Sequence, residues 1–188
     1  MFHLQLLLLG HSDRLLILIC HNYRSIFNCE NYLKHRIESF FFILLLKIFI
    51  YQDSTKVVFS AIATGNGHTG PFNTDKTIIY NTVLTNVGKA YNHFTGIFTA
   101  PVAGVYYFSF FYHAGGECQA RLYLYNNNKL VVMTSDHKST QDGADNGGNA
   151  VFLHLLPEEQ VYVKLAPNSH VWVGETHTTF SGHLVYEM

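Results

Sequence analysis

The strongest constraint on the fold is the run VYYFSFFY, Val105–Tyr112, which follows the turn-forming residues 100–104. Its β-branched and aromatic residues favour an extended strand. Because side chains alternate along a strand, one face carries Val105, Tyr107, Ser109 and Phe111, and the other carries Tyr106, Phe108, Phe110 and Tyr112. Neither face is polar, whereas a strand of a monomeric sandwich presents one face to water. The run predicts a central strand covered on both faces, with a partner subunit as the second cover.

Length and charge narrow the class of protein. The chain has 188 residues, enough for one domain with some sequence left over. Its formal net charge of -1 gives no electrostatic attraction to nucleic acid. Aromatic residues make up 15% of the chain, charged residues only 13%, and the 14 glycines suit a turn-rich β protein. We expect a β-rich protein with no nucleic-acid partner.

Residues 1–55 differ in character from the rest of the chain. They contain the apolar pieces QLLLLG, LLILIC and FFFILLLKIFIY, and Lys34-His35-Arg36 precedes the last of them. A secretory signal has a basic start and an apolar stretch of about 7–15 residues. A spanning helix needs about 20 apolar residues, and these pieces are shorter. Three interpretations stay open for this apolar segment: a signal peptide or signal anchor, a membrane-anchoring interfacial segment, or sequence outside the mature fold.

From residue 56 onward, short apolar or alternating runs are separated by turn residues at regular intervals. Strands are predicted at 56–63, 77–84, 96–99, 105–112, 119–125, 130–134, 150–156, 160–166, 171–174 and 179–186. No segment of this part shows a sustained period of 3.6 residues. Evenly spaced strands without helices predict a single all-β domain over residues 56–188, either a sandwich or a jelly roll.

Two glycine patterns add detail to this domain. The sequence GNGHTG, residues 65–70, matches the G-x-G-x-x-G pattern of dinucleotide-binding proteins, but that motif works only when a helix follows it. Here Pro71 and then β-branched residues follow, so we predict a flexible surface loop. Gly182 lies inside the last predicted strand, which indicates that a large ring or another backbone segment packs against it.

A set of residues at fixed spacing resembles the signature of the globular head of complement C1q. The matching residues are Asn86, Tyr91, Phe98, Gly104, Tyr106, Phe108 and Phe110. Tyr80 stands where the family signature begins with Phe. The sequence TFSGHLVYE at 179–187, with Phe180, Gly182 and Tyr186, resembles the family's closing strand, and residues 150–165 resemble the hairpin before it. The resemblance covers residues 56–188.

This resemblance implies a ten-stranded jelly roll of the tumour-necrosis-factor type that assembles as a trimer and acts by binding. The trimer would be a homotrimer or a heterotrimer with related chains, and the signature strand would lie near its subunit interface. Many members of the family carry a collagen stalk before the head. No Gly-X-Y repeat occurs here, so the chain resembles a head-only member.

The resemblance also implies a calcium site. Some members bind calcium through aspartates in the loop before a Leu-His-Leu strand, and the corresponding residues 136–150 contain Asp136 and Asp145. Calcium takes six to eight oxygen ligands, many of them carboxylates. The alternative is a solvated acidic loop whose glycines and asparagines form turns. No cofactor other than calcium is expected.

Residues typical of catalytic or zinc sites occur without the required spacing. The histidines after residue 56 form no H-x-x-x-H or H-E-x-x-H pair, which argues against a zinc site. No G-x-S-x-G motif occurs. Cys118 has no second cysteine in its domain, and we predict a buried free thiol. We therefore expect no enzymatic activity.

Two binding functions and one enzymatic alternative follow. The first is a secreted recognition module of the innate-immune or complement type, with a protein, carbohydrate or microbial surface as its ligand. The second is a cytokine-like or cell-surface receptor ligand on the same trimeric fold. The third, a hydrolase built on a β-sandwich, needs a constellation of catalytic residues that the sequence does not reveal.

Overall fold

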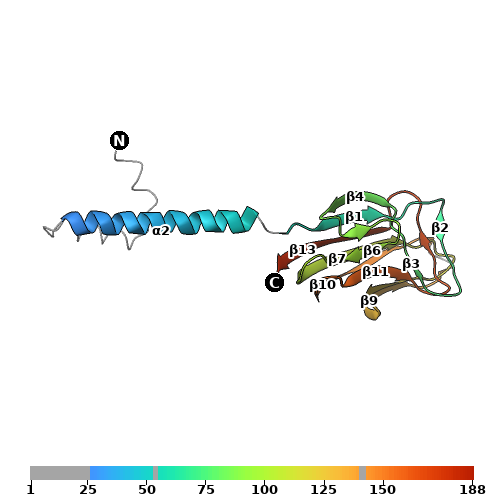
Figure 1. Ribbon diagram of the computed structural model, residues 1–188. Coiled ribbons are helices and arrows are strands. Elements are labelled where there is room, and N and C mark those ends of the chain that lie inside the picture. Colours follow the sequence, from blue (N-terminus) through green and yellow to red (C-terminus); the bar gives the residue numbers. More distant parts are fainter. Residues whose placement is uncertain (1–25, 53–54, 140–142) are drawn as a thin grey trace. The chain divides into compact units, whose positions relative to one another are not determined.

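A computed structural model describes residues 26–52, 55–139 and 143–188 (Figure 1). The chain divides into two compact units, residues 1–54 and Thr55–Met188. In the first unit, α2 (Ile26–Gln52) is a helix of 27 residues. In the described part of the chain, no helix has an apolar stretch long enough to cross a membrane.

The apolar part of α2 surrounds the helix instead of forming one stripe. Residues 40–46 are seven consecutive apolar residues, and successive residues in a helix are 100° apart. All seven side chains are exposed. The pieces QLLLLG and LLILIC lie outside the described residues, so the three interpretations of the N-terminal segment stay predictions.

The second unit is a sandwich of antiparallel strands. The described strands are β1 (Val58–Ile62), β2 (His68–Thr69), β3 (Lys76–Thr77), β4 (Thr82–Val87), β5 (Tyr91–Asn92), β6 (Ile97–Thr99), β7 (Gly104–His113), β8 (Ala120–Asn126), β9 (Lys129–Asp136), β10 (Asn146–Leu155), β11 (Gln160–Leu165), β12 (Val171–Trp172) and β13 (Thr179–Glu187). The prediction of an all-β jelly-roll domain is confirmed.

Two sheets form the layers of the sandwich. A 5-stranded sheet has the order β10-β7-β13-β1-β4, and β7, β13 and β10 run side by side in Figure 1. A 6-stranded sheet has the order β5-β6-β11-β8-β9, with β3 paired to β11. The two-residue strands β2 and β12 pair with each other at one end. The strand β7 lies between β10 and β13, as predicted for a central strand.

The structure corrects two sequence expectations. Residues 77–84 were predicted as one strand, but β3 pairs with β11 of one sheet and β4 pairs with β1 of the other. The chain therefore crosses between the sheets at residues 78–81, where Ile78 and Tyr80 are buried. The predicted loop at 65–70 contains β2, whose residues pair with Val171 and Trp172. Residues 91–92 form β5, which the sequence reading did not predict.

Aromatic rings fill the space between the sheets. The Phe59 ring stacks on Tyr91 with centroids 4.7 Å apart and meets Phe180 edge-on at 4.9 Å. A Cβ atom added to Gly182 would lie 2.5 Å from the Phe108 ring and 2.8 Å from the Phe59 ring. The prediction of a large ring against Gly182 is confirmed. Every residue of this core lies between 57 and 180, so the unit forms its core without α2.

Candidate functional site

The outward side of the 5-stranded sheet is the candidate interaction surface, and we call it the outer face. Strand alternation and register place these residues on it: Val58, Ser60, Ile62, Thr82, Thr85, Val87, Val105, Tyr107, Ser109, Phe111, His113, Asn146, Gly148, Ala150, Phe152, His154, Thr179, Ser181, His183 and Tyr186. Among these described positions there is no Asp, Glu, Lys or Arg. A solvated sheet face ordinarily carries such residues, so this one is suited to being covered.

Large apolar side chains of the outer face are exposed in the single chain. The exposed fractions are 64% for Phe152, 49% for Phe111 and 47% for Val87. At its centre, the Tyr107 ring lies 4.9 Å from the Phe152 ring and 5.5 Å from the His183 ring. The neighbouring hydroxyls of Ser60 and Ser181 hydrogen-bond to each other at 2.9 Å. The outer face thus combines exposed aromatic and aliphatic side chains with small polar groups and imidazoles.

The opposite sheet differs, because its outward side carries charged residues. Lys164 on β11 forms a salt bridge of 2.7 Å with Asp75, and its ammonium lies 4.9 Å from the centroid of the Tyr125 ring. The hydrogen bond to Asp75 raises the pKa of Lys164. Arg121 lies on the same side of β8. Charges of this kind are typical of a face in contact with water, so the outward sides of the two sheets suit different surroundings.

The rings of the family-like signature lie inside the unit. Tyr80, Tyr91, Phe98, Tyr106, Phe108, Phe110 and Phe180 are all buried. Burial in the core means that they pack within their own chain, whereas the sequence reading had grouped them with the trimer interface. The surface of β7 that is left for a partner is the opposite row, which contains Val105, Tyr107 and Phe111. The signature therefore marks the strand, and the residues between its members form the outer face.

Hydrogen bonds fix the remaining signature positions. The Asn86 side chain donates from Nδ2 to the Tyr91 carbonyl at 2.8 Å and accepts from the Tyr91 N–H at 3.3 Å, which closes the turn between β4 and β5. The Tyr91 hydroxyl donates to the Tyr80 carbonyl at 3.0 Å. Burial raises the pKa of both tyrosines. A Cβ on Gly104 would lie 2.6 Å from the carbonyl oxygen of the exposed residue Tyr186, so only glycine fits there.

The two aspartates proposed as calcium ligands lie close to one tyrosine. Asp136 ends β9 and Asp145 immediately precedes β10. Burial raises the pKa of Tyr112, a hydrogen bond with Thr134 partly opposes this, and the negative charges of Asp136 and Asp145 also raise it. The described residues contain no group of three His, Cys, Asp or Glu side chains that could hold a metal ion. A calcium site at these aspartates stays a prediction, and Asp142 of the same loop lies outside the described residues.

The fold forms two histidine pairs that the sequence did not reveal. The His113 and His177 rings stack with centroids 4.7 Å apart, and His177 Nε2 lies 3.1 Å from Glu175 Oε2. The His68 and His170 rings are 5.3 Å apart. Each pair joins residues far apart in sequence. His68 lies on β2, which pairs with β12, and His170 immediately precedes β12. No spacing in the sequence indicates either pair.

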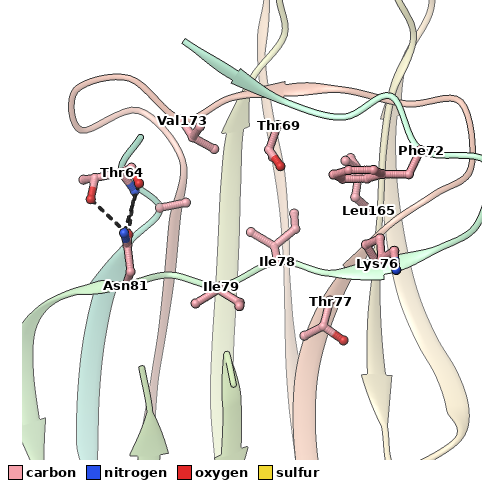
Figure 2. Close-up of a pocket in the computed structure, with 11 residues that line it drawn as sticks. Thr64, Thr69, Phe72, Lys76, Thr77, Ile78, Ile79, Asn81, Leu165 and Val173 are labelled. Carbon is pink, nitrogen blue, oxygen red and sulfur yellow. Dashed lines mark hydrogen bonds between the residues drawn. The ribbon is translucent and has the colours of Figure 1, made fainter. Parts of the chain in front are cut away.

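A shallow cleft of about 470 Å³ lies near β2 and β3 (Figure 2). Ile78, Leu165 and Val173 contribute apolar surface, and the Thr64 and Asn81 side chains hydrogen-bond at one end. Lys76 is the one charged residue in its lining, which contains no acid, histidine or cysteine. The cleft therefore offers no acid–base pair. Cys118, predicted to be buried, is a half-buried free thiol.

The two antiparallel sheets define a jelly-roll sandwich of the C1q and tumour-necrosis-factor type. The C1q domain family matches residues 58–185, which is more than half of the chain. The chain belongs to the C1q domain family.

Solved structures of this class share the fold at low sequence identity. The globular domain of zebrafish complement 1qA protein matches with a TM-score of 0.57 and 22% identity, over 71% of this chain and 99% of that one. Eiger TNF from S. frugiperda matches with a TM-score of 0.52 and 11% identity, over 71% and 95%. Murine APRIL matches with a TM-score of 0.54 and 9% identity, over 69% and 99%. These similarities establish the fold.

Proposed function

We propose that the protein is a secreted, trimeric binding module whose subunits associate through the outer face of the 5-stranded sheet. The observation that carries the proposal is that this face has exposed rings and no Asp, Glu, Lys or Arg, while the other sheet carries charges. Burying apolar surface releases about 25 cal/mol per Å². Interfaces between permanently associated subunits are more apolar than the ordinary protein surface. The trimer is formed by this chain alone or with related chains.

The function supported best is recognition of a protein, carbohydrate or microbial surface in innate immunity. Membership of the C1q domain family supports this role. The similarity to Eiger TNF and APRIL keeps a receptor ligand of the cytokine type as the alternative on the same fold. Both are binding functions outside the cell, and neither requires catalysis. Direct binding to microbial surfaces without receptor activation favours the first, and receptor activation favours the second.

Calcium fits this proposal as a structural ion. Asp136 and Asp145 both lie near Tyr112, at the end of β7. Two carboxylates from each of three subunits would repel one another unless a cation offset their charge. Calcium, bound with further carbonyl or water oxygens, would supply that charge.

The test is the solution mass of Thr55–Met188 by light scattering. This unit contains its whole core and is expected to fold by itself. Val87→Asp places a charge on the outer face, on the edge strand β4. Leu130→Asp is the matched control, because Leu130 is 44% exposed, close to the 47% of Val87, and lies on β9 at the edge of the other sheet.

We expect a trimer for the unit and for Leu130→Asp, and a monomer for Val87→Asp. A monomeric parent unit, or a Val87→Asp variant that stays trimeric, contradicts the proposed interface. Repeating the measurement with calcium and with a chelator tests the ion. Weaker association in the chelator supports the aspartate site, and an unchanged trimer removes calcium from the proposal.

A further inference from the structure

We propose that the trimer disassembles at mildly acidic pH because His183, at the centre of the outer face, becomes protonated. This inference rests on the proposed function, since it concerns the interface that assembly would bury. Its basis is the position of one titratable side chain in an otherwise uncharged surface.

His183 lies on β13, the middle strand of the sheet order β10-β7-β13-β1-β4. Its cross-strand neighbours are Tyr107 on β7 and Val58 on β1. The Tyr107 ring is 5.5 Å from the His183 ring, and Phe152 lies beyond it. Association through this face would therefore place the imidazole in the middle of the buried area.

No carboxylate faces His183 from the strands packed beside it. Besides His183, the titratable groups of the outer face are Tyr107, His113, His154 and Tyr186. None of these is an anion at neutral or acidic pH. The carboxylate at the end of the same strand, Glu187, is four residues away, or about 13 Å along an extended chain. Equivalent residues of the three copies meet at the axis of a trimer, so the part of the outer face that lies there meets the same uncharged groups of the other copies.

A neutral imidazole can be buried in such an interface at little cost, but a protonated one cannot. An unpaired charge moved from water into an apolar contact is strongly disfavoured. Imidazole titrates near pH 6.5, so about nine in ten solvent-exposed histidines carry a proton at pH 5.5. Burial of the outer face in an interface would disfavour the protonated imidazole. Proton binding therefore favours the separated subunits.

The size of the effect follows from linkage. Suppose that burial in the interface lowers the proton affinity of the imidazole tenfold. The association constant at pH 5.5 then falls about fivefold for each histidine, and about a hundredfold for the three copies together. His154 lies opposite Val105 on the edge strand β10, and a smaller contribution is expected there because an edge residue keeps more contact with water.

Sedimentation velocity on Thr55–Met188 at pH 7.5 and pH 5.5, over a dilution series, measures the trimer association constant. His183→Gln keeps a polar side chain of similar size that does not titrate. His93→Gln is the matched control, because His93 is an exposed histidine after β5 of the other sheet. Circular dichroism at both pH values shows whether the subunits stay folded.

We expect the parent unit and His93→Gln to associate about a hundredfold more weakly at pH 5.5, with the fold retained. For His183→Gln we expect a loss of less than about tenfold. A parent trimer equally strong at both pH values overturns this inference and leaves the proposed function intact. The same holds if His183→Gln loses association as steeply as its parent. A parent unit that is monomeric at pH 7.5 fails the proposed function itself.

Discussion

His170 is a buried histidine whose environment favours its neutral form. It is only 4% exposed, and its Nε2 atom has no hydrogen-bond partner among the described residues. A Cβ on Gly115 would lie 3.0 Å from that Nε2, so the backbone of Gly115 comes close to the ring. Burial lowers the pKa of His170, the nearby His68 ring lowers it further, and Glu117 partly opposes this.

Because the pKa of His170 is lowered in the folded state, its contribution to stability is fully present above the unfolded value of about 6.5. It is lost as pH falls below 6.5, since the unfolded chain then binds the proton first. We predict that the free energy of unfolding of Thr55–Met188 falls between pH 7 and pH 5, and that His170→Gln reduces this slope. Urea unfolding in the Val87→Asp background, in which the proposed trimer is expected not to form, measures this slope without interference from assembly. An equal slope in His170→Gln would mean that other groups cause the acid sensitivity.

At the scale of the element, the two faces of β7 differ in their burial within the single chain. Tyr106, Phe108 and Phe110 are 0% exposed and pack in the core, whereas Phe111 on the outer face is 49% exposed. A polar residue in the first row should disrupt folding, and a charged residue in the second row should disrupt the proposed association. The same strand therefore allows the two effects to be measured separately.

We predict that Phe108→Ala lowers the free energy of unfolding by about 3–5 kcal/mol, the usual cost of removing a buried ring. The Phe108 ring contacts Phe59, Phe98 and Phe180, with centroids 6.4, 5.1 and 6.1 Å away. Phe111→Ala is the matched control on the same strand. In the monomeric Val87→Asp background it should change stability by less than about 1 kcal/mol, because its ring is half exposed in the monomer. Equal losses for the two variants would contradict the assignment of the faces.

Features within one strand were predictable from the sequence, and features that depend on strand neighbours were not. The alternation of side chains along β7 correctly divided its residues into a core row and an outward row. Gly182 correctly indicated that an aromatic ring packs against the last strand. The crossing between β3 and β4 was missed because Ile78, Ile79 and Tyr80 continue the β-branched and aromatic pattern through the crossing. The uncharged outer face needed the register of five strands, which no local pattern contains.

At the scale of the whole molecule, the sandwich forms its core from its own residues. The buried cluster extends from Val57 to Phe180 and contains no residue of α2. The apolar residues 40–46 of α2 are exposed in their own unit. The free energy of folding of this unit is therefore expected to come from groups within Thr55–Met188.

We predict that removing residues 1–54 changes the melting temperature of the β-sandwich by less than about 2 °C. In a domain of 60–100 residues, a change of about 1 kcal/mol in stability shifts the melting temperature by about 4–8 °C, and in a larger domain the shift is smaller. Differential scanning calorimetry of the full chain and of Thr55–Met188, both with Val87→Asp to remove assembly, makes the comparison. A truncated unit that melts several degrees lower contradicts this prediction, because groups outside Thr55–Met188 would then contribute to the stability of the sandwich.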